Sequence, residues 1–239
     1  MSEAMAPLGF FDRFTNDDKF STLRCIIDNI KRLGVDEFGS IMLKVFEYAS
    51  EMKLKGDYLE FGCFGGYTMT WAYKAAKAFG MKDIKFYGFD SFEGLPEIKG
   101  VDAEYPEFKG GEFCSTEKQF YKDLKRGGVD ISRVVTIPGW YDGTLSDELS
   151  ERLAVKEAAV ILVDCDLYCS TVPVLEFITK YIADGTVILF DDWNCFRSSP
   201  EHGEQRAVRE WLERYKDITM TKYLPFEAFG QSFIAHRKS

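Results

Sequence analysis

Val160-Ile-Leu-Val163-Asp164 and Thr186-Val-Ile-Leu-Phe190-Asp191-Asp192 are two apolar runs that each end on aspartate. Short runs of this kind are typical of buried strands in a parallel sheet, and open α/β sheets bind ligands at the carboxyl ends of their strands. Neighbouring strands lie about 4.8 Å apart, and Mg²⁺ binds oxygen at about 2.1 Å. We therefore expect Asp164, Asp191 and Asp192 to meet at one place, with a hard divalent metal as the first hypothesis.

Strand and helix patterns alternate along the rest of the chain after residue 56. Strands are predicted at 57–61, 85–89, 134–138, 160–163, 186–190, 219–224 and 231–236, and helices at 68–79, 116–126, 147–153, 171–181 and 204–215. This alternation predicts an α/β fold with a doubly wound, mostly parallel, seven-stranded sheet of Rossmann-like type. The charged, proline- and glycine-containing stretch 93–113 is predicted to be a long functional loop.

The residues before the sheet show helical periodicity. Apolar residues recur at helical spacing in two groups, Leu23, Ile26, Ile27, Ile30 and then Ile41, Met42, Val45, Phe46, Ala49. We predict that residues 1–55 form an N-terminal helical cap or lid and that residues 56–239 form the catalytic domain, in one compact domain overall. Helices that only add to the core, or that form a dimer surface, are the alternatives.

Composition excludes several classes of function. The chain of 239 residues carries 30 Lys and Arg against 39 Asp and Glu, without a basic run, which argues against nucleic-acid binding. It has no leader-like N-terminus and no apolar run of about 18 residues, so we expect a cytoplasmic protein without a membrane partner. The six cysteines lack zinc-type spacing and are expected to be reduced. A small-molecule substrate is therefore favoured.

Glycines follow the first predicted strand, in the stretch Glu60-Phe-Gly62-Cys-Phe-Gly-Gly66-Tyr-Thr68. They allow a ligand to approach the backbone closely, but their spacing departs from the G-x-G-x-x-G of dinucleotide sites. Glu60 would repel a pyrophosphate and attract a cation, so S-adenosylmethionine, which carries a sulfonium and an ammonium group, fits better than NAD. A tight turn with a structural glutamate is the alternative.

Two further strand ends complete the expected cofactor site. Asp90, followed by Ser91, ends the second strand, where a carboxylate can accept hydrogen bonds from both ribose hydroxyls. Gly139 and Trp140 follow the third strand and offer a surface for adenine. Asp90 as the cap of a turn and Trp140 as a core residue are the structural alternatives.

Several segments of the chain together resemble the macrocin O-methyltransferase family of sugar O-methyltransferases, which act in macrolide and aminocoumarin antibiotic pathways. The matching segments are Leu59-Glu-Phe-Gly-Cys-Phe-Gly-Gly66, Asp90-Ser-Phe-Glu-Gly-Leu-Pro96, Pro138-Gly-Trp140, Leu162-Val-Asp-Cys-Asp-Leu-Tyr-Cys-Ser-Thr171 and Val187-Ile-Leu-Phe-Asp-Asp-Trp193. The resemblance implies a class I methyltransferase fold and a homodimer. It also implies Mg²⁺ at Asp164, Asp191 and Asp192, and a cofactor site that includes Glu60, Gly62, Gly66 and Asp90.

Five polar residues near the expected crevice have catalytic or binding roles to be assigned. Asp164 is expected to act as both metal ligand and proton acceptor, and His202 is a second candidate base because its usual pKa is near 6.5, with a solvated loop position as the alternative. Asp166 should point to the opposite face if the strand persists, so we expect a supporting or structural role. Tyr168 and Arg197 could contact substrate hydroxyls from the rim.

The sequence thus predicts an S-adenosylmethionine- and Mg²⁺-dependent O-methyltransferase that acts on a hydroxyl of a small molecule. The expected acceptor is a sugar or a sugar-bearing natural product, and catechol or peptide acceptors stay open. An NAD(P)-dependent oxidoreductase of Rossmann type and a non-catalytic methyltransferase-like binding subunit are the alternatives.

Overall fold

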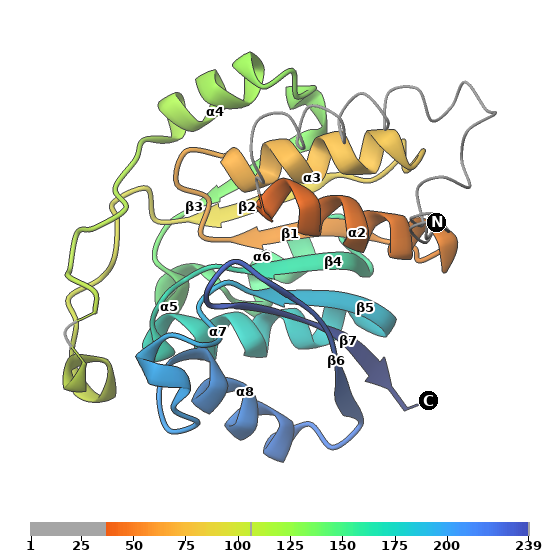
Figure 1. The fold of residues 1–239 in the computed structure, drawn as a ribbon. Coiled ribbons are helices and arrows are strands. Elements are labelled where there is room, and N and C mark those ends of the chain that lie inside the picture. Colours follow the sequence, from red (N-terminus) through yellow and green to blue (C-terminus); the bar gives the residue numbers. More distant parts are fainter. Residues whose placement is uncertain (1–36, 106, 239) are drawn as a thin grey trace, which may run out of the picture. The chain divides into compact units, whose positions relative to one another are not determined.

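The computed structural model describes residues 37–105 and 107–238, and these form one compact unit built on a seven-stranded sheet (Figure 1). The strands lie in the order β3-β2-β1-β4-β5-β7-β6. Their bounds are β1 Asp57–Phe61, β2 Phe86–Asp90, β3 Val134–Pro138, β4 Ala158–Val163, β5 Ile182–Phe190, β6 Ile218–Phe226 and β7 Gly230–Arg237.

Parallel pairing joins β3, β2, β1, β4 and β5, whereas β7 is antiparallel to both β5 and β6. The first strand, β1, lies in the middle of the sheet. Strands β2 and β3 extend the sheet on one side of β1, and β4 lies on the other side. This reversal of strand order opens a crevice at the carboxyl ends of β1 and β4, which is where such sheets bind ligands. The predicted fold class is confirmed.

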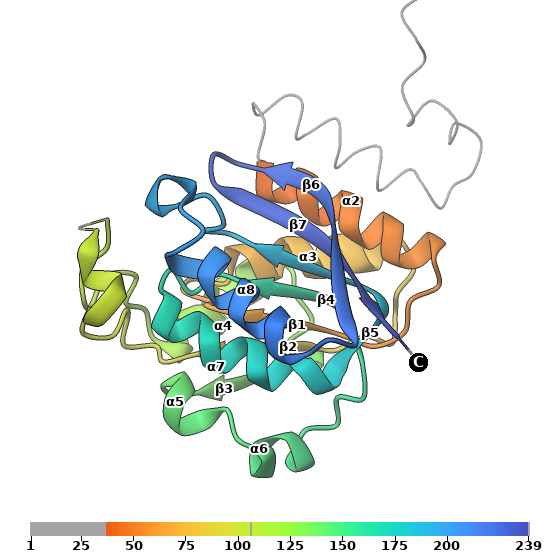
Figure 2. The same ribbon diagram turned by 90° about the horizontal axis from the view of Figure 1, so that it is seen from below.

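Helices cover both faces of the sheet (Figure 2). Helix α2 (Glu37–Glu51) contacts α3 (Tyr67–Ala78) on one face, and α4 (Glu117–Arg126) adjoins α3. Helix α7 (Tyr168–Ile178) contacts α8 (Gly203–Arg214) and the short α5 (Tyr141–Thr144) on the other face, and α6 (Asp147–Arg152) follows α5 in the chain. Because helices shield both faces, β4 is buried along its whole length, and its run of apolar residues is the consequence.

The element boundaries differ from the predictions in a few places. Helix α7 begins three positions earlier than the predicted start at 171, β5 begins at Ile182, and the predicted loop 93–113 contains a 3-10 turn, η3 (Gly100–Glu104). The predicted helical group Leu23 to Ile30 lies outside the described residues. The second group forms α2, which belongs to the same unit as the sheet. A role for residues 1–55 as a cap over the site stays a prediction.

Membrane spanning was tested on the described helices. Within residues 37–105 and 107–238, none combines the length and the apolar character needed to cross a bilayer.

Candidate active site

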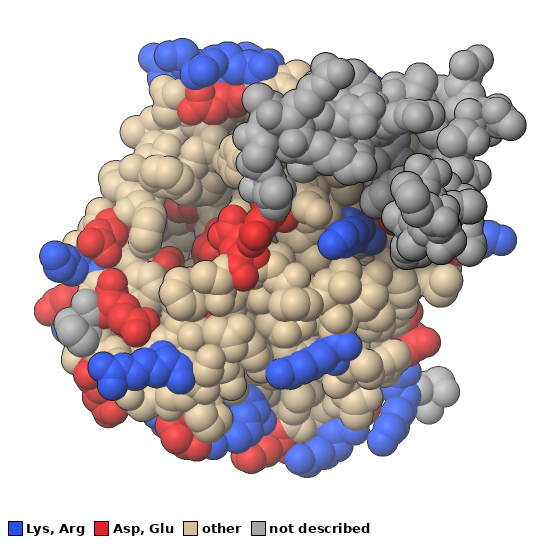
Figure 3. Space-filling view, in the orientation of Figure 1, with Lys and Arg blue, Asp and Glu red and all other residues tan. Residues whose placement is uncertain are grey.

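A cavity of about 730 Å³ lies at the carboxyl ends of the parallel strands. Five strands reach it through residues at or just beyond their ends: Gly62 after β1, Asp90 and Ser91 at β2, Gly139 and Trp140 after β3, Asp164 after β4, and Asp191 and Asp192 after β5. The space-filling view shows acidic side chains beside a hollow on this face (Figure 3). The volume falls within the range of about 300–1,000 Å³ that is usual for ligand and cofactor sites.

The turn after β1 brings two strand ends together, and only glycine fits there. Gly62 has a φ of 91°, and a Cβ atom at this position would lie 1.6 Å from the carbonyl oxygen of Asp164. Gly66 has a φ of 73° and begins helix α3. Gly62 lines the cavity, whereas Gly66 and Thr68, which we expected to contact the cofactor, are absent from its described wall.

Asp90 braces the same turn. One carboxylate oxygen accepts hydrogen bonds from the backbone N–H groups of Cys63 (2.7 Å) and Phe64 (2.9 Å), and the other accepts from Phe92 (2.7 Å). The hydrogen bond from Phe92 caps the turn that follows Asp90, which is the contact that the structural alternative predicted. The carboxylate also lines the cavity, and the oxygen that accepts from Phe92 keeps a second lone pair that a ligand hydroxyl can use.

Glu60 is fully buried beneath the turn rather than exposed to the cavity. Its two carboxylate oxygens accept hydrogen bonds from the hydroxyls of Tyr58 (2.6 Å) and Thr68 (2.7 Å). Burial raises the pKa of Glu60 to about 8, although these hydrogen bonds lower it. At neutral pH the group is therefore mostly protonated, so it lacks the exposed charge on which its expected role in cofactor binding depended.

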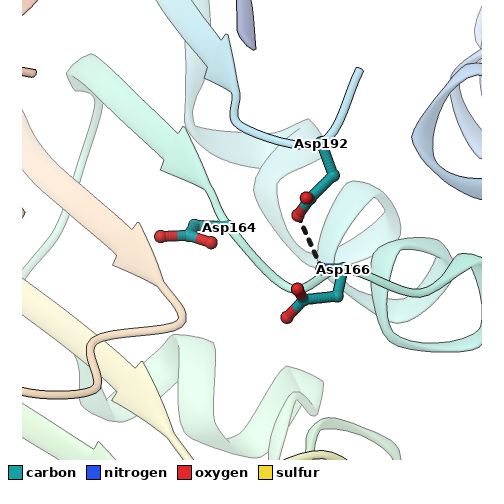
Figure 4. Close-up of side chains that lie close together, drawn as sticks. All are labelled: Asp164, Asp166 and Asp192. Carbon is teal, nitrogen blue, oxygen red and sulfur yellow. Dashed lines mark hydrogen bonds between the residues drawn. The ribbon is translucent and has the colours of Figure 1, made fainter. Parts of the chain in front are cut away.

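An acidic cluster lines the part of the cavity that β4 and β5 reach. One carboxylate oxygen from each of Asp164, Asp166 and Asp192 lies within 4.8 Å of the other two. In Figure 4 these side chains converge from the loops that follow the two strands, and the backbone N–H of Asp166 donates to Asp192 (3.1 Å). Asp191 lines the same cavity without belonging to this group of three.

The position of Asp166 differs from the expectation that it would point to the opposite face. That expectation assumed that the strand continues, but β4 ends at Val163 and Asp166 has a φ of 60°, in the left-handed region. With the backbone turned in this way, the N–H of Asp166 meets Asp192, and one carboxylate oxygen of Asp166 lies within 4.8 Å of oxygens of Asp164 and Asp192. The cluster therefore contains Asp166 where we expected Asp191.

Burial and mutual repulsion raise the pKa values in this cluster. Burial is the largest cause for Asp164, whose pKa is raised well above its usual value, and the charges of Asp191 and Asp192 add to it. Burial and the charge of Asp192 raise the pKa of Asp166 to about 8 and that of Asp191 to about 8. Asp192 is raised less, to about 6, because Cys195 and the Asp166 backbone donate hydrogen bonds to it.

These carboxylates suit a hard divalent cation. Nothing in residues 37–105 and 107–238 forms an ion pair with any of the four aspartates at the ends of β4 and β5. Two oxygens bound to one Mg²⁺ lie at most about 4.2 Å apart, so small rotations of the side chains would close the observed spacing. Several carboxylate oxygens without a basic partner form the donor set that Mg²⁺ prefers.

His202 lies outside the described wall of the cavity. Its Nε2 lies 2.9 Å from a carboxylate oxygen of Glu104, and its Nδ1 lies 2.9 Å from the hydroxyl of Ser199. The ring also packs edge-on against Tyr105. The contact with Glu104 joins the His202 loop to the 93–113 loop, and a role for His202 as catalytic base stays a prediction.

The two expected rim residues take different positions. Arg197 lines the cavity and lies over the ring of Tyr105 (5.8 Å). The hydroxyl of Tyr168 instead donates to Glu210, and the Tyr168 ring packs beneath Arg206, both on α8. Arg197 alone of the two faces the cavity.

The sequence did not identify the apolar wall of the cavity. Phe64, Phe113 and Phe229 each line it with more than half of the residue exposed, and Leu95, Pro96 and Phe108 add to it from the 93–113 loop. Large exposed aromatic side chains that surround a cavity are a recognised sign of a ligand site. The length and composition of the 93–113 stretch predicted a loop of the kind that is often functional, but they did not indicate which of its residues line the cavity.

Comparison with known families identifies the chain. The model of the macrocin-O-methyltransferase (TylF) family matches residues 35–220, which include the glycine turn, Asp90 and the whole acidic cluster. The chain belongs to this family. The resemblance inferred from the sequence motifs is therefore confirmed.

Two proteins whose names state an O-methyltransferase activity are similar to part of this chain. An 8-demethyl-8-(2,3-dimethoxy-alpha-L-rhamnosyl)-tetracenomycin-C 4'-O-methyltransferase of Streptomyces olivaceus is 30% identical over 143 residues, 58% of this chain and 53% of that enzyme. A mycinamicin III 3''-O-methyltransferase of Micromonospora griseorubida is 28% identical over 167 residues, 67% of this chain and 61% of that enzyme. The matched regions thus span less than two thirds of either relative.

Solved structures share the fold at low identity. The O-methyltransferase NovP superposes with a TM-score of 0.71 at 18% identity, covering 86% of this chain and 81% of NovP. The calicheamicin methyltransferase CalS11 superposes with a TM-score of 0.67 at 20% identity, covering 98% of this chain and 99% of CalS11. The macrocin-O-methyltransferase family member described here thus has the fold of known O-methyltransferases.

Proposed function

We propose that this chain is an S-adenosylmethionine-dependent O-methyltransferase that methylates a sugar hydroxyl of a small molecule with the help of a divalent ion such as Mg²⁺. The observation that carries the proposal is a single cavity with two chemically different sides. One side has the glycine turn, Asp90 and Trp140, and the other has the cluster Asp164, Asp166 and Asp192.

The first side suits a nucleoside with a cationic centre. Asp90 offers a lone pair for a ribose hydroxyl, Gly62 and Gly139 allow close approach to the backbone, and Trp140 offers an exposed ring for the base. S-adenosylmethionine supplies a methyl group on a sulfonium, and the acidic wall favours that positive charge. The dinucleotide alternative has no support from the family match.

The second side suits activation of a hydroxyl. A divalent ion bound by Asp164, Asp166 and Asp192, with Asp191 close by, would supply Lewis acidity that lowers the pKa of an acceptor hydroxyl. Asp164 is our candidate to accept the hydroxyl proton, because it lies at the end of β4 beside the turn that carries Gly62. The hydroxyl oxygen then forms a bond to the methyl carbon while the carbon–sulfur bond breaks.

The charges on the wall bear on the form of the sugar acceptor. Among the described residues that line the cavity, Arg197 is the one basic side chain, whereas Asp90, Glu107 and Asp142 add to the acidic cluster. A nucleoside diphosphate sugar would bring two phosphates to a wall on which Arg197 is the one described basic side chain. An uncharged glycoside with an apolar aglycone fits the exposed aromatic rings better.

The activity test uses methyl-labelled S-adenosylmethionine and two acceptor panels, uncharged glycosides with apolar aglycones and nucleoside diphosphate sugars. We expect label in the glycosides, loss of turnover after EDTA treatment and recovery with Mg²⁺. Asp164→Asn is the inactive control. Full turnover in EDTA would contradict the metal role, and label only in the nucleotide sugars would contradict the acceptor assignment. The expected homodimer and cytoplasmic location stay predictions.

A further inference from the structure

The 93–113 loop is attached to the rim of the cavity by three acidic side chains. Asp102, Glu104 and Glu107 reach, respectively, the start of helix α7, the ring of His202 (2.9 Å) and the backbone N–H of Phe196 (2.8 Å). The other two acids are at least partly exposed, but Asp102 is only 2% exposed. A buried carboxylate is costly unless its partners repay the desolvation, so these contacts indicate a specific role.

Asp102 caps helix α7 from a distant part of the sequence. Its carboxylate oxygens accept hydrogen bonds from the first two backbone N–H groups of the helix, those of Tyr168 (2.8 Å) and Cys169 (3.1 Å). The residue at the usual capping position, Leu167, makes no side-chain cap and cannot make one. Asp102 therefore satisfies donors that the local sequence leaves unpaired, and its charge complements the helix dipole.

The turn just before this helix carries the Asp166 carboxylate. The turn is tight, with the backbone N–H of Leu167 donating to the carbonyl of Cys165 (2.6 Å), and Asp166 itself is held at a φ of 60°. A non-glycine residue in the left-handed region persists where its surroundings fix it. Asp192 fixes one side of the turn through the Asp166 N–H, and the capped helix fixes the other.

We propose that Asp102 is a positioning residue for the acidic cluster: by capping α7 it holds the 164–167 turn in the conformation that directs Asp166 toward Asp164 and Asp192. This inference rests on the proposed function, because it concerns the residues that would hold the metal. It adds a residue that touches neither cofactor nor metal and that lies more than sixty positions away in the sequence.

The same contact links the two walls of the cavity. The 93–113 loop supplies Leu95, Pro96 and Phe108 to the apolar wall, and Asp102 ties that loop to the turn that carries Asp166. The acceptor wall and the metal-binding cluster are therefore parts of one hydrogen-bonded unit. A change that loosens the attachment of the 93–113 loop at Asp102 should therefore also weaken metal binding.

The test measures Mg²⁺ affinity by calorimetry on the full chain with S-adenosylhomocysteine present. Asp102→Asn should weaken Mg²⁺ binding by about tenfold, as is usual when a supporting partner of a metal ligand is removed, and Asp102→Ala should weaken it further. Hydrogen exchange at the Tyr168 and Cys169 amides should become faster. Affinity for S-adenosylhomocysteine should stay within about twofold of the wild type.

Glu97→Gln is the matched control, because Glu97 is an exposed acid of the same loop that pairs with the exposed Lys99. It should leave Mg²⁺ affinity unchanged. If Asp102→Ala fails to fold, Asp102→Asn, which keeps one acceptor oxygen, decides the question. Unchanged Mg²⁺ affinity in a folded Asp102 variant, or an equal loss of affinity for S-adenosylhomocysteine, would overturn the role of Asp102 but not the proposed function. Wild-type protein that binds no divalent ion would overturn the proposed metal role as well.

Discussion

Metal-free protein should lose stability as the pH rises, and Asp166 should be a main cause. Burial and the charge of Asp192 raise its folded-state pKa to about 8, whereas an unfolded aspartate has a pKa near 4. A carboxyl with a raised folded pKa contributes its full stability below the unfolded pKa and loses it as the pH rises through the folded pKa. The loss should therefore extend from about pH 4 to about pH 8.

The expected size follows from proton linkage. Each carboxyl that stays protonated only in the folded state lowers the free energy of unfolding by about 1.4 kcal/mol per pH unit. For a domain of this size that corresponds to a Tm decrease of roughly 3–6 °C per pH unit. A bound divalent ion should oppose it, and Mg²⁺ at a hundred times its dissociation constant adds about 2.7 kcal/mol.

Asp166→Asn separates these effects, because its backbone N–H can still donate to Asp192. The variant should show a shallower fall of Tm with pH in EDTA, a higher metal-free Tm near pH 7.5 than the wild type, and little stabilisation by Mg²⁺. Thermal unfolding followed by circular dichroism between pH 5 and 8, with EDTA or Mg²⁺, measures all three. Asp147→Asn, at an exposed aspartate paired with Lys180, is the control. Equal slopes for wild type and Asp166→Asn, or equal stabilisation by Mg²⁺, would refute the reasoning.

Substitutions at Gly62, Asp90 and His202, with Gly65 as a control, test single contacts. Gly62→Ala should lower the Tm by many degrees or prevent folding, because its Cβ would overlap the Asp164 carbonyl. Gly65→Ala, which has no atom near its Cβ, should be tolerated. Similar Tm values for the two variants would contradict this reasoning. Asp90→Ala should weaken S-adenosylhomocysteine binding, measured by calorimetry, more than Asp90→Asn does, because three backbone N–H groups lose their acceptor in the alanine variant. Undiminished affinity in Asp90→Ala would remove the assignment of Asp90 to the cofactor site. His202→Asn should keep the pH profile of kcat, because the ring bonds Glu104 and Ser199, and a lost limb of that profile would restore His202 as the base.

The strands and the crevice followed from local sequence. Runs bounded by turn residues predicted the seven described strands. In the central strands β4 and β5 these runs are apolar, because burial on both faces of a parallel sheet requires continuous hydrophobic side chains. The strand-end positions of Gly62, Asp90, Asp164 and Asp192 then placed them at the cavity, since parallel strands present their carboxyl ends at one edge. That part of the site is a consequence of periodicity and sheet geometry.

Several residue assignments depended on information that no short stretch contains. Glu60 sits next to the turn in sequence, but the hydroxyls of Tyr58 and Thr68 hold it in the interior. His202 follows the aspartate strand, but Glu104, nearly a hundred residues away, bonds its ring. In both cases the position along the chain follows from the sequence, whereas the side-chain contacts that fix each group are visible only in the structure.

By itself, the sequence determined the family, the sheet and the delivery of carboxylates to the ends of two adjacent strands. Tertiary structure decided which of those carboxylates converge: the left-handed turn at Asp166 and the cap supplied by Asp102 direct a side chain that strand alternation would have pointed away. The physical reason is that side-chain direction beyond a strand depends on one or two backbone angles. Those angles are set by hydrogen bonds to groups that are distant in sequence.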